Sequence, residues 1–177
     1  MRVNWQSIII RLILRIALIG YMGSGKTTVG RLLAAQMNLP FIDLDQRIEL
    51  QEGMSITDIF RNKGEAHFRK IESELLIEIL NTEEKFVLAT GGGTPCFFDQ
   101  IDLLNEQCTT VYLQCAFSEI ERRLAESPNN RPMLSNLSVS IHDHLRERIK
   151  TYYQAKIIVD GELPATSLSQ YIQSKLA

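Results

Sequence analysis

Short apolar runs alternate along the chain with longer segments in which apolar residues recur at helical spacing. The runs cover residues 16–19, 41–44, 86–89, 110–115 and 157–159. They are rich in β-branched or aromatic residues, as is typical of buried parallel strands. Between residues 65 and 80, Phe68, Ile71, Leu75 and Ile79 share one face of a helix. The alternation predicts a three-layer α/β sandwich around a five-stranded, mostly parallel sheet.

Local signals predict where several helices begin or break. Ser118 stands three residues before Glu121, which is the spacing of a capping box. Ser55 and Ser138 are candidate N-caps. Gly64 is expected to separate a short helix from a longer one.

The composition limits the classes of function. The chain has 177 residues, of which 45% are apolar and 23% charged, and this fits one globular domain over residues 1–177. A net charge of −2 argues against a general nucleic-acid binder, which normally carries a basic excess. Any bound anion must therefore be held by a few placed cations.

The N-terminal segment and the cysteines bear on location. Residues 8–19 are strongly apolar, but Arg11 and Arg15 interrupt them, which argues against a membrane segment. Residues 1–13 are expected to be an N-terminal extension. The spacing of Cys96, Cys108 and Cys115 matches no metal or redox motif, so we expect reduced thiols in a cytoplasmic protein. We also expect a monomer without membrane or nucleic-acid partners.

A phosphate-binding motif follows the first apolar run. Residues 20–27 read GYMGSGKT and satisfy GxxxxGK[ST] in full, between an apolar strand and an amphipathic helix. Glycines let backbone N–H groups surround a phosphate, and the helix N-terminus adds partial positive charge. Such a motif predicts binding of ATP and Mg²⁺ but does not identify the acceptor. The residues expected to contact them are Gly23, Ser24, Gly25, Lys26, Thr27 and Thr28.

Two carboxylates end the second apolar run. As alternate residues of a strand, Asp43 and Asp45 are expected to point the same way at the carboxyl end of the sheet. One could help to hold Mg²⁺ while the other orients a substrate hydroxyl as a base. An acidic N-cap for the following helix is the alternative.

Two further segments suggest anion binding by the acceptor site. Arg69 lies beside an apolar helical stripe, where a guanidinium can bind a carboxylate, although its spacing from Glu72 favours an ordinary solvated ion pair. Gly91, Gly92 and Gly93 follow the third apolar run. Three glycines in succession indicate close backbone approach to a ligand.

Two more arginines are candidates with ordinary alternatives. Arg131 lies in the loosely patterned segment 126–137, where it could close over the γ-phosphate as part of a lid or lie in solvent. Arg148, on the helix after Ser138, could be a second clamp for an anion or belong to a solvated helix face.

Six blocks in register resemble the shikimate kinase family. They read GYMGSGKTTVG, FIDLD, GEAHFRKIE, TGGGTP, RPML and the segment 148–152, and the resemblance extends from residue 16 to about residue 171. The resemblance implies the fold of P-loop and nucleoside monophosphate kinases with sheet order 2-3-1-4-5. It also implies transfer of the ATP γ-phosphate to the 3-hydroxyl of shikimate, in the pathway to chorismate and the aromatic amino acids.

The resemblance also implies roles for individual residues. Lys26, Asp45 and Arg131 would be catalytic, with Asp45 as base and Arg131 in the lid. Thr27 and Asp43 would serve Mg²⁺. The family's shikimate site would correspond to Asp45, Arg69, Gly91, Gly92, Gly93 and Arg148. Arg123 is a weaker match for the arginine that packs on adenine, and residues 160–164 lie where the adenine loop is expected.

Two departures and two rival functions remain at this stage. The extension has no counterpart in the family, and the short lid segment is less basic than in many members.

Another small-molecule P-loop kinase, such as a gluconate or nucleoside monophosphate kinase, would share only the phosphate loop. A catalytically silent sensor domain would be expected to lose Lys26, Asp45 and Arg131.

Overall fold

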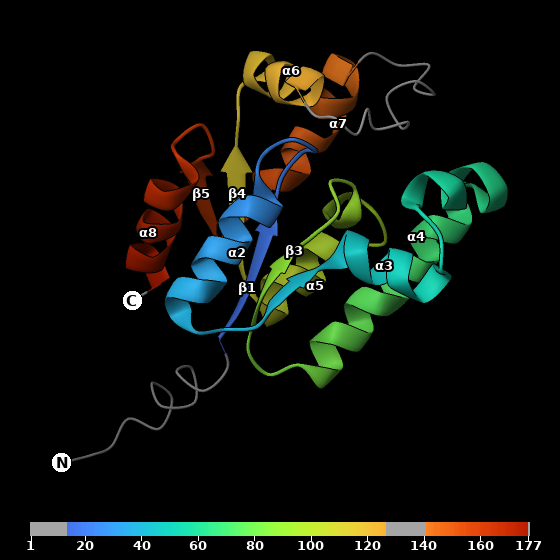
Figure 1. The fold of residues 1–177 in the computed structure, drawn as a ribbon, viewed down its shortest axis with the longest axis horizontal. Coiled ribbons are helices and arrows are strands. Elements are labelled where there is room, and N and C mark those ends of the chain that lie inside the picture. Colours follow the sequence, from blue (N-terminus) through green and yellow to red (C-terminus); the bar gives the residue numbers. More distant parts are fainter. Residues whose placement is uncertain (1–13, 127–140, 177) are drawn as a thin grey trace.

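The computed structural model describes residues 14–126 and 141–176 and contains one parallel sheet. Its strands are β1 (Arg15–Ile19), β2 (Phe41–Asp43), β3 (Phe86–Ala89), β4 (Thr109–Gln114) and β5 (Ile157–Asp160). Every pairing is parallel, and the order is β2-β3-β1-β4-β5 (Figure 1). The predicted five-stranded sheet and its order are therefore confirmed.

Helices cover both faces of the sheet. They are α2 (Lys26–Met37), α3 (Leu44–Glu52), α4 (Ile56–Thr82), α5 (Gln100–Gln107), α6 (Phe117–Glu126), α7 (Ile141–Tyr152) and α8 (Ala165–Leu176), with a 3₁₀ turn at Thr94–Cys96. Core residues of α2 and α8 pack on one face, and those of α4, α5 and α7 on the other. The predicted three-layer sandwich is confirmed.

The central strand β1 explains why the apolar runs are almost continuous. Ile16 and Leu18 pack toward α2 and α8, whereas Ala17 and Ile19 pack toward the opposite layer. All four side chains are fully buried. A strand covered on both faces has no position for a solvated side chain.

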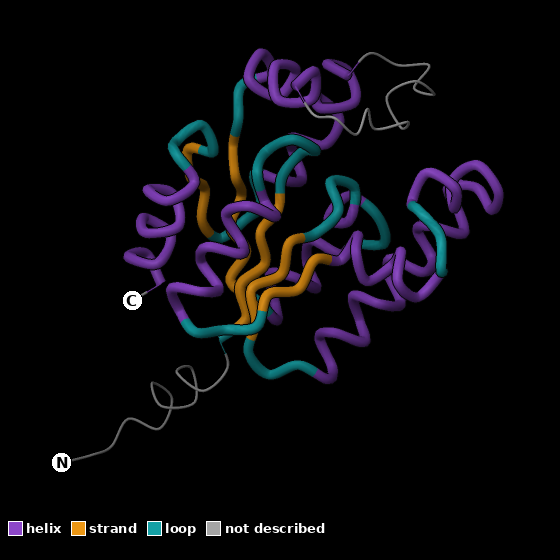
Figure 2. The backbone as a smooth tube through the Cα atoms, in the orientation of Figure 1, coloured by secondary structure: helices purple, strands orange, loops and turns teal. Residues whose placement is uncertain are grey.

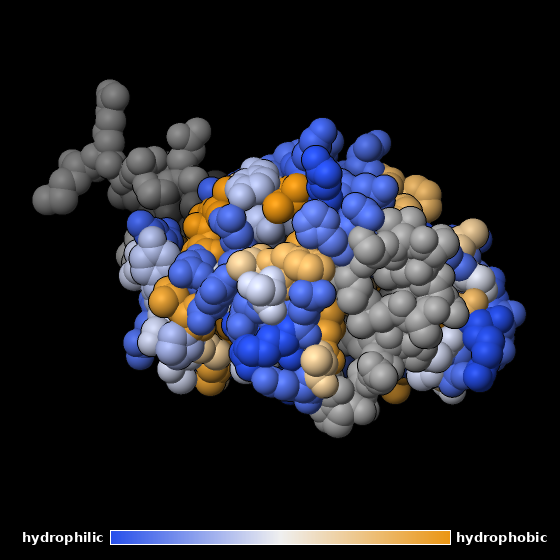
Figure 3. All heavy atoms as spheres, turned by 90° about the horizontal axis from the view of Figure 1, so that it is seen from above, coloured by the Kyte–Doolittle hydropathy of each residue, from blue (hydrophilic) through white to orange (hydrophobic). Residues whose placement is uncertain are grey.

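The parallel arrangement gathers the loops of the chemistry-bearing segments at one edge. In Figure 2 the five strands run side by side, and the loops after β1 and β3 emerge at the same end of the sheet. Seen from that end, much of the surface is hydrophilic, with apolar residues between (Figure 3). Ligands bind at this edge in open α/β sheets.

Two of the four predicted helix signals are confirmed, and one is wrong. The Ser55 side chain accepts a hydrogen bond from Asp58 N and caps α4, and Gly64 (φ 82°, ψ 167°) breaks the helical path inside α4. The predicted capping box at Ser118 is wrong. Ser118 lies inside the first turn of α6, where Ile120 N already donates to Ala116 O. Ser138 and the extension 1–13 lie outside the described residues.

Two further observations concern the cysteines and the membrane. Cys96, Cys108 and Cys115 are free, and burial raises the pKa of Cys108 to about 12. Across residues 14–126 and 141–176, no helix has the length and apolar character required to cross a bilayer.

A stability test follows from the packing of α4. Leu76 is fully buried, while its neighbour Ile77 is 45% exposed. We expect Leu76→Ala to lower the free energy of unfolding by about 2–5 kcal/mol because it leaves a cavity. Ile77→Ala, the matched control, should cost less than about 1 kcal/mol. Urea unfolding measures both, and equal losses would contradict the layer assignment.

Candidate active site

The phosphate loop connects β1 to the N-terminus of α2. Gly20, Gly23 and Gly25 have φ values of 143°, 82° and 92°, which L-residues with a Cβ rarely adopt. The buried Lys26 Nζ donates hydrogen bonds to Gly20 O at 2.8 Å and Tyr21 O at 2.9 Å. The ammonium is thus held inside the loop, next to where a phosphate would lie.

The two aspartates after β2 lie together, but not for the predicted reason. The strand ends at Asp43, and α3 begins at Leu44, so Asp45 belongs to the first turn of a helix. The Asp43 side chain caps that helix through Gln46 N and also accepts a hydrogen bond from Thr27 Oγ1 at 2.8 Å. The N-cap alternative is therefore correct for Asp43, and it does not exclude a role beside Thr27.

A cavity of about 540 Å³ joins the phosphate loop to these carboxylates. Its lining includes residues 23–29, Asp43, Asp45, Thr90, Gly92, Arg123 and the loop 161–165. Every nucleotide-binding residue predicted in the described part of the chain, Thr28 included, lines this cavity.

Arg123 ties together two loops of this cavity. Its guanidinium donates to Gly161 O at 3.0 Å and to Gly23 O at 3.4 Å, and its Nε donates to Glu119 at 2.6 Å. Hydrogen bonds from Arg122 and Arg123 lower the pKa of Glu119 to about 2. Arg123 therefore lies between the phosphate loop and residues 161–165.

Arg69 forms a buried ion pair rather than a solvated one. Its side chain is 4% exposed and pairs with Glu72, 1% exposed, at 2.8 Å. Glu72 also accepts a hydrogen bond from Thr94 Oγ1 at 2.6 Å. The partly exposed Glu65 accepts from both Nε and Nη2 of Arg69 at 3.2 Å. The solvated-pair alternative, which the spacing favoured, is wrong.

Two of the three glycines leave room for these charged side chains. A Cβ on Gly93 would lie 2.6 Å from the Arg69 guanidinium nitrogens, and one on Gly91 would lie 2.7 Å from Glu72 Oε1. None of the three has a positive φ. Gly91 and Gly93 are therefore required for space beside the protein's own side chains, whereas a Cβ on Gly92 would lie 3.2 Å from Met22 N in the phosphate-loop backbone.

Arg148 is also buried, so a solvated helix face is wrong here too. It is 7% exposed, on α7. The positive charges of Arg148 and Arg69 both act on the Cys96 thiol, although burial dominates and raises the pKa of that thiol. The two guanidinium groups thus share one neighbourhood beside the glycine run.

Sequence reasoning missed one aromatic partner of this site. The Arg69 guanidinium lies 4.2 Å from the ring centroid of Phe97 and 5.0 Å from that of Phe68. Stacking on aromatic faces holds a guanidinium in one plane. An aromatic residue shortly after a glycine run carries no distinctive pattern, so the signal was weak.

Arg131 and residues 127–137 of the expected lid lie outside the described residues.

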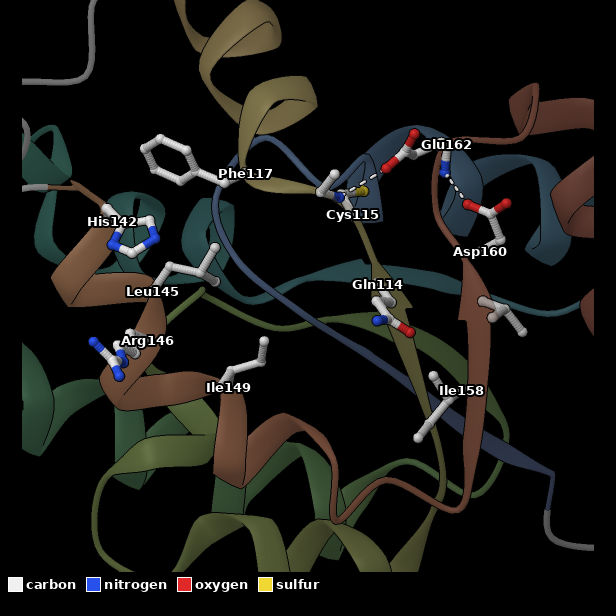
Figure 4. A pocket seen from close by; sticks show the side chains of 12 residues that line it. Gln114, Cys115, Phe117, His142, Leu145, Arg146, Ile149, Ile158, Asp160 and Glu162 are labelled. Atoms are coloured by element: carbon white, nitrogen blue, oxygen red, sulfur yellow. Dashed lines mark hydrogen bonds between the residues drawn. The ribbon is translucent and has the colours of Figure 1, made fainter.

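A second cavity, of about 660 Å³, lies on the α7 side of β4 and β5. Phe117, His142, Leu145, Ile149 and Ile158 surround it in Figure 4. It is the larger of the two, but no residue of the phosphate loop and neither aspartate lines it. The phosphate loop and the two aspartates thus identify the smaller cavity as the candidate active site, while Arg69 and Arg148 line neither cavity.

Comparison with known proteins identifies the family. A family model described as shikimate kinase matches residues 22–177. The chain belongs to the shikimate kinase family. A shikimate kinase from Azobacteroides pseudotrichonymphae is 44% identical over 149 residues, which cover 81% of this chain and 88% of that protein. One from Aquifex aeolicus is 41% identical over 151 residues, covering 85% and 89%.

Solved structures agree with this family. The shikimate kinase from Bacteroides thetaiotaomicron has a TM-score of 0.84 and 37% identity, covering 93% of this chain and 98% of its own. The enzyme from Acinetobacter baumannii, in complex with shikimate, has a TM-score of 0.85 and 32% identity, covering 96% of each chain. A gluconokinase from Sinorhizobium meliloti, with 19% identity and a TM-score of 0.55, shares the fold alone. The predicted ATP-dependent shikimate kinase is confirmed.

The buried ion pair generates a prediction about stability. Glu72→Gln removes the negative charge beside buried Arg69, and an uncompensated buried charge is strongly destabilising. We expect the free energy of unfolding to fall by about 3 kcal/mol. Glu74→Gln is the matched control on α4: Glu74 is 59% exposed and its ion pair with Lys70 is long, at 3.8 Å. That variant should lose less than about 0.5 kcal/mol. Similar losses in denaturant titrations would show that Arg69 needs no buried counter-charge.

Proposed function

We propose that the residues around the smaller cavity transfer the ATP γ-phosphate to the 3-hydroxyl of shikimate. The observation that best supports this proposal is the position of Asp45. It lies beside the phosphate loop on one side and beside Gly91, next to the Arg69–Glu72 pair, on the other. A base in this position lies between the loop that would hold ATP and the arginine that would bind the shikimate carboxylate, where it can accept the proton of the attacking hydroxyl.

The phosphate loop is suited to the ATP phosphates. Its N–H groups and the N-terminus of α2 favour negative charge, and Lys26 can turn from loop carbonyls to the β- and γ-phosphates. The Ser24 hydroxyl is buried without a hydrogen-bond partner among the described residues, which fits a loop built around an absent anion. Arg123 and residues 161–165 would flank the adenine.

Thr27 and Asp43 would serve Mg²⁺. A hydroxyl and a carboxylate 2.8 Å apart are the hard oxygen groups that this ion prefers, and Mg²⁺ usually keeps several waters and binds through few protein groups. Bound there with ATP, it would neutralise charge on the β- and γ-phosphate oxygens.

The acceptor would be held by groups on three elements. Arg69 on α4 and Arg148 on α7 would bind the shikimate carboxylate, while the glycine run would line the site. Asp45 would accept the proton of the attacking hydroxyl. Arg131 would stabilise charge on the transferring phosphoryl group, a role that rests on the sequence match alone.

We further propose a monomeric enzyme of the cytoplasm. The free cysteines fit a reducing compartment, and the net charge of −2 gives no basis for nucleic-acid binding. Large exposed apolar residues in the described part of the chain, including Leu50, Ile77, Phe98 and Tyr171, are spread over the fold, which fits a monomer.

Release of ADP that depends on added shikimate, with formation of shikimate 3-phosphate, tests the reaction directly.

The two aspartates can be separated by matched substitutions. Asp45→Asn cannot accept a proton, so we expect kcat to fall at least about 100-fold while the KM for ATP stays within about twofold. Asp43→Asn keeps a good N-cap and should instead raise the Mg²⁺ concentration needed for half-maximal activity. Steady-state kinetics with Mg²⁺ titration measures both effects. A reversal of the two patterns would exchange the proposed roles.

The carboxylate clamp has a matched control on its own helix. Arg148→Ala should weaken shikimate binding by about 2–3 kcal/mol, the scale for losing a charged, buried partner. Arg146 is exposed on α7, and Arg146→Ala should leave the affinity within about twofold. The neutral methyl ester of shikimate should bind the wild type poorly and be indifferent to Arg148→Ala. Titration calorimetry gives these affinities, and equal sensitivity of acid and ester would mean that Arg148 is only structural.

A further inference from the structure

One face of α7 connects to both loops of the active site. His144, Arg148 and Tyr152 are spaced by four residues and therefore share that face. Tyr152 OH donates to Gly92 O in the glycine run at 2.5 Å. The Nδ1 atom of His144 forms a hydrogen bond with Tyr21 OH at 2.8 Å. Arg148 thus lies between two attachments, one to each loop.

Tyr21 belongs to the phosphate loop through its backbone and to α7 through its side chain. Its carbonyl oxygen accepts hydrogen bonds from Lys26 Nζ at 2.9 Å and from Ser24 N at 3.2 Å. Its ring is 1% exposed and meets the His144 imidazole edge-on, with centroids 5.7 Å apart. The GxxxxGK[ST] motif does not require tyrosine at this position, so the phosphate-binding role leaves this contact unexplained.

The charges around His144 favour a neutral imidazole that can accept this hydrogen bond. Burial lowers the pKa of His144, and the positive charges of Arg148 and Arg69 lower it further, against the opposing effect of Glu147 and Glu65. Burial raises the pKa of Tyr21, and Arg148 opposes that shift. At neutral pH a protonated phenol therefore faces an uncharged ring. The Arg148 guanidinium is near enough to influence both groups.

We propose that the Tyr21–His144 pair is a positioning pair that holds Arg148 in place for the carboxylate of the acceptor. The inference rests on the proposed role of Arg148. Tyr152 attaches the C-terminal end of this face to the glycine run. The pair attaches the same face to the phosphate loop one turn before Arg148. Without the pair, the first half of α7 would lose its side-chain hydrogen bond to the phosphate loop. The guanidinium would then bind a carboxylate in less favourable geometry.

The test is a double-mutant cycle with a ligand that reports on the carboxylate. Tyr21→Phe keeps the ring and removes the hydroxyl, and His144→Ala removes its partner. Each should weaken shikimate binding in calorimetry about three- to tenfold, the scale of one hydrogen bond. The double variant should be no weaker than either single one. Affinity for the neutral methyl ester should not change in any of them.

Two further variants guard against misreading a folding defect. His144→Asn places a side-chain hydrogen-bonding atom near the position of Nδ1 and should retain shikimate affinity within about twofold of wild type. His142 lies two residues earlier, 59% exposed, on the side of α7 that borders the second cavity (Figure 4). His142→Ala is the matched control and should bind both ligands like the wild type.

The outcomes separate this inference from the function on which it rests. Unchanged shikimate affinity in both single variants, equal loss for acid and ester, or additive effects in the double variant would each overturn the positioning role. If Arg148→Ala weakens shikimate binding in the same series, the proposed clamp stands whatever the pair does. If Arg148→Ala has no effect, the clamp fails and the positioning role fails with it.

Discussion

The buried Arg69–Glu72 ion pair is the interaction on which the proposed acceptor side of the site depends. Removing two charges from water costs several kcal/mol per ion, and only good geometry with further hydrogen bonds offsets that cost. Here Thr94 satisfies Glu72, Phe97 covers the guanidinium, and Gly93 leaves space for it. One electrostatic requirement therefore fixes α4, the glycine run and the 3₁₀ turn relative to one another.

The parallel sheet brings that pair to the phosphate loop. β1 pairs with β3 on one side and β4 on the other, so the loops after β1 and β3 leave the sheet side by side. Asp43, the last residue of β2, connects that strand to the phosphate loop, because its carboxylate both caps α3 and accepts a hydrogen bond from Thr27. Because Asp43 is the N-cap, α3 begins at the next residue, and Asp45 lies in the first turn of that helix beside Gly91.

The sequence predicted the fold well because both faces of the sheet are covered, which forces recognisable apolar runs. The apolar runs agree with the strand bounds within one residue at each end, although Asp45, expected on a strand, lies in α3. The same patterns could not predict burial of Arg69 or Arg148, because a solvated and a buried helical residue have the same spacing. Nor could they predict that the strand at Asp43 has only three residues. The Phe97 and Tyr152 contacts are tertiary and leave no local pattern.

The two arginines are held by different means, and this has consequences for an incoming carboxylate. Both nitrogens on one edge of Arg69 are engaged by Glu65, an exposed side chain, whereas buried Glu72 takes Nη1. Glu65 is 54% exposed and its carboxylate can return to water, so under the proposed function a ligand carboxylate would replace it on that edge while Glu72 stays. In that proposal Arg69 would supply mainly geometry, since Glu72 already neutralises it. The additional positive charge would come from Arg148, which is buried on α7.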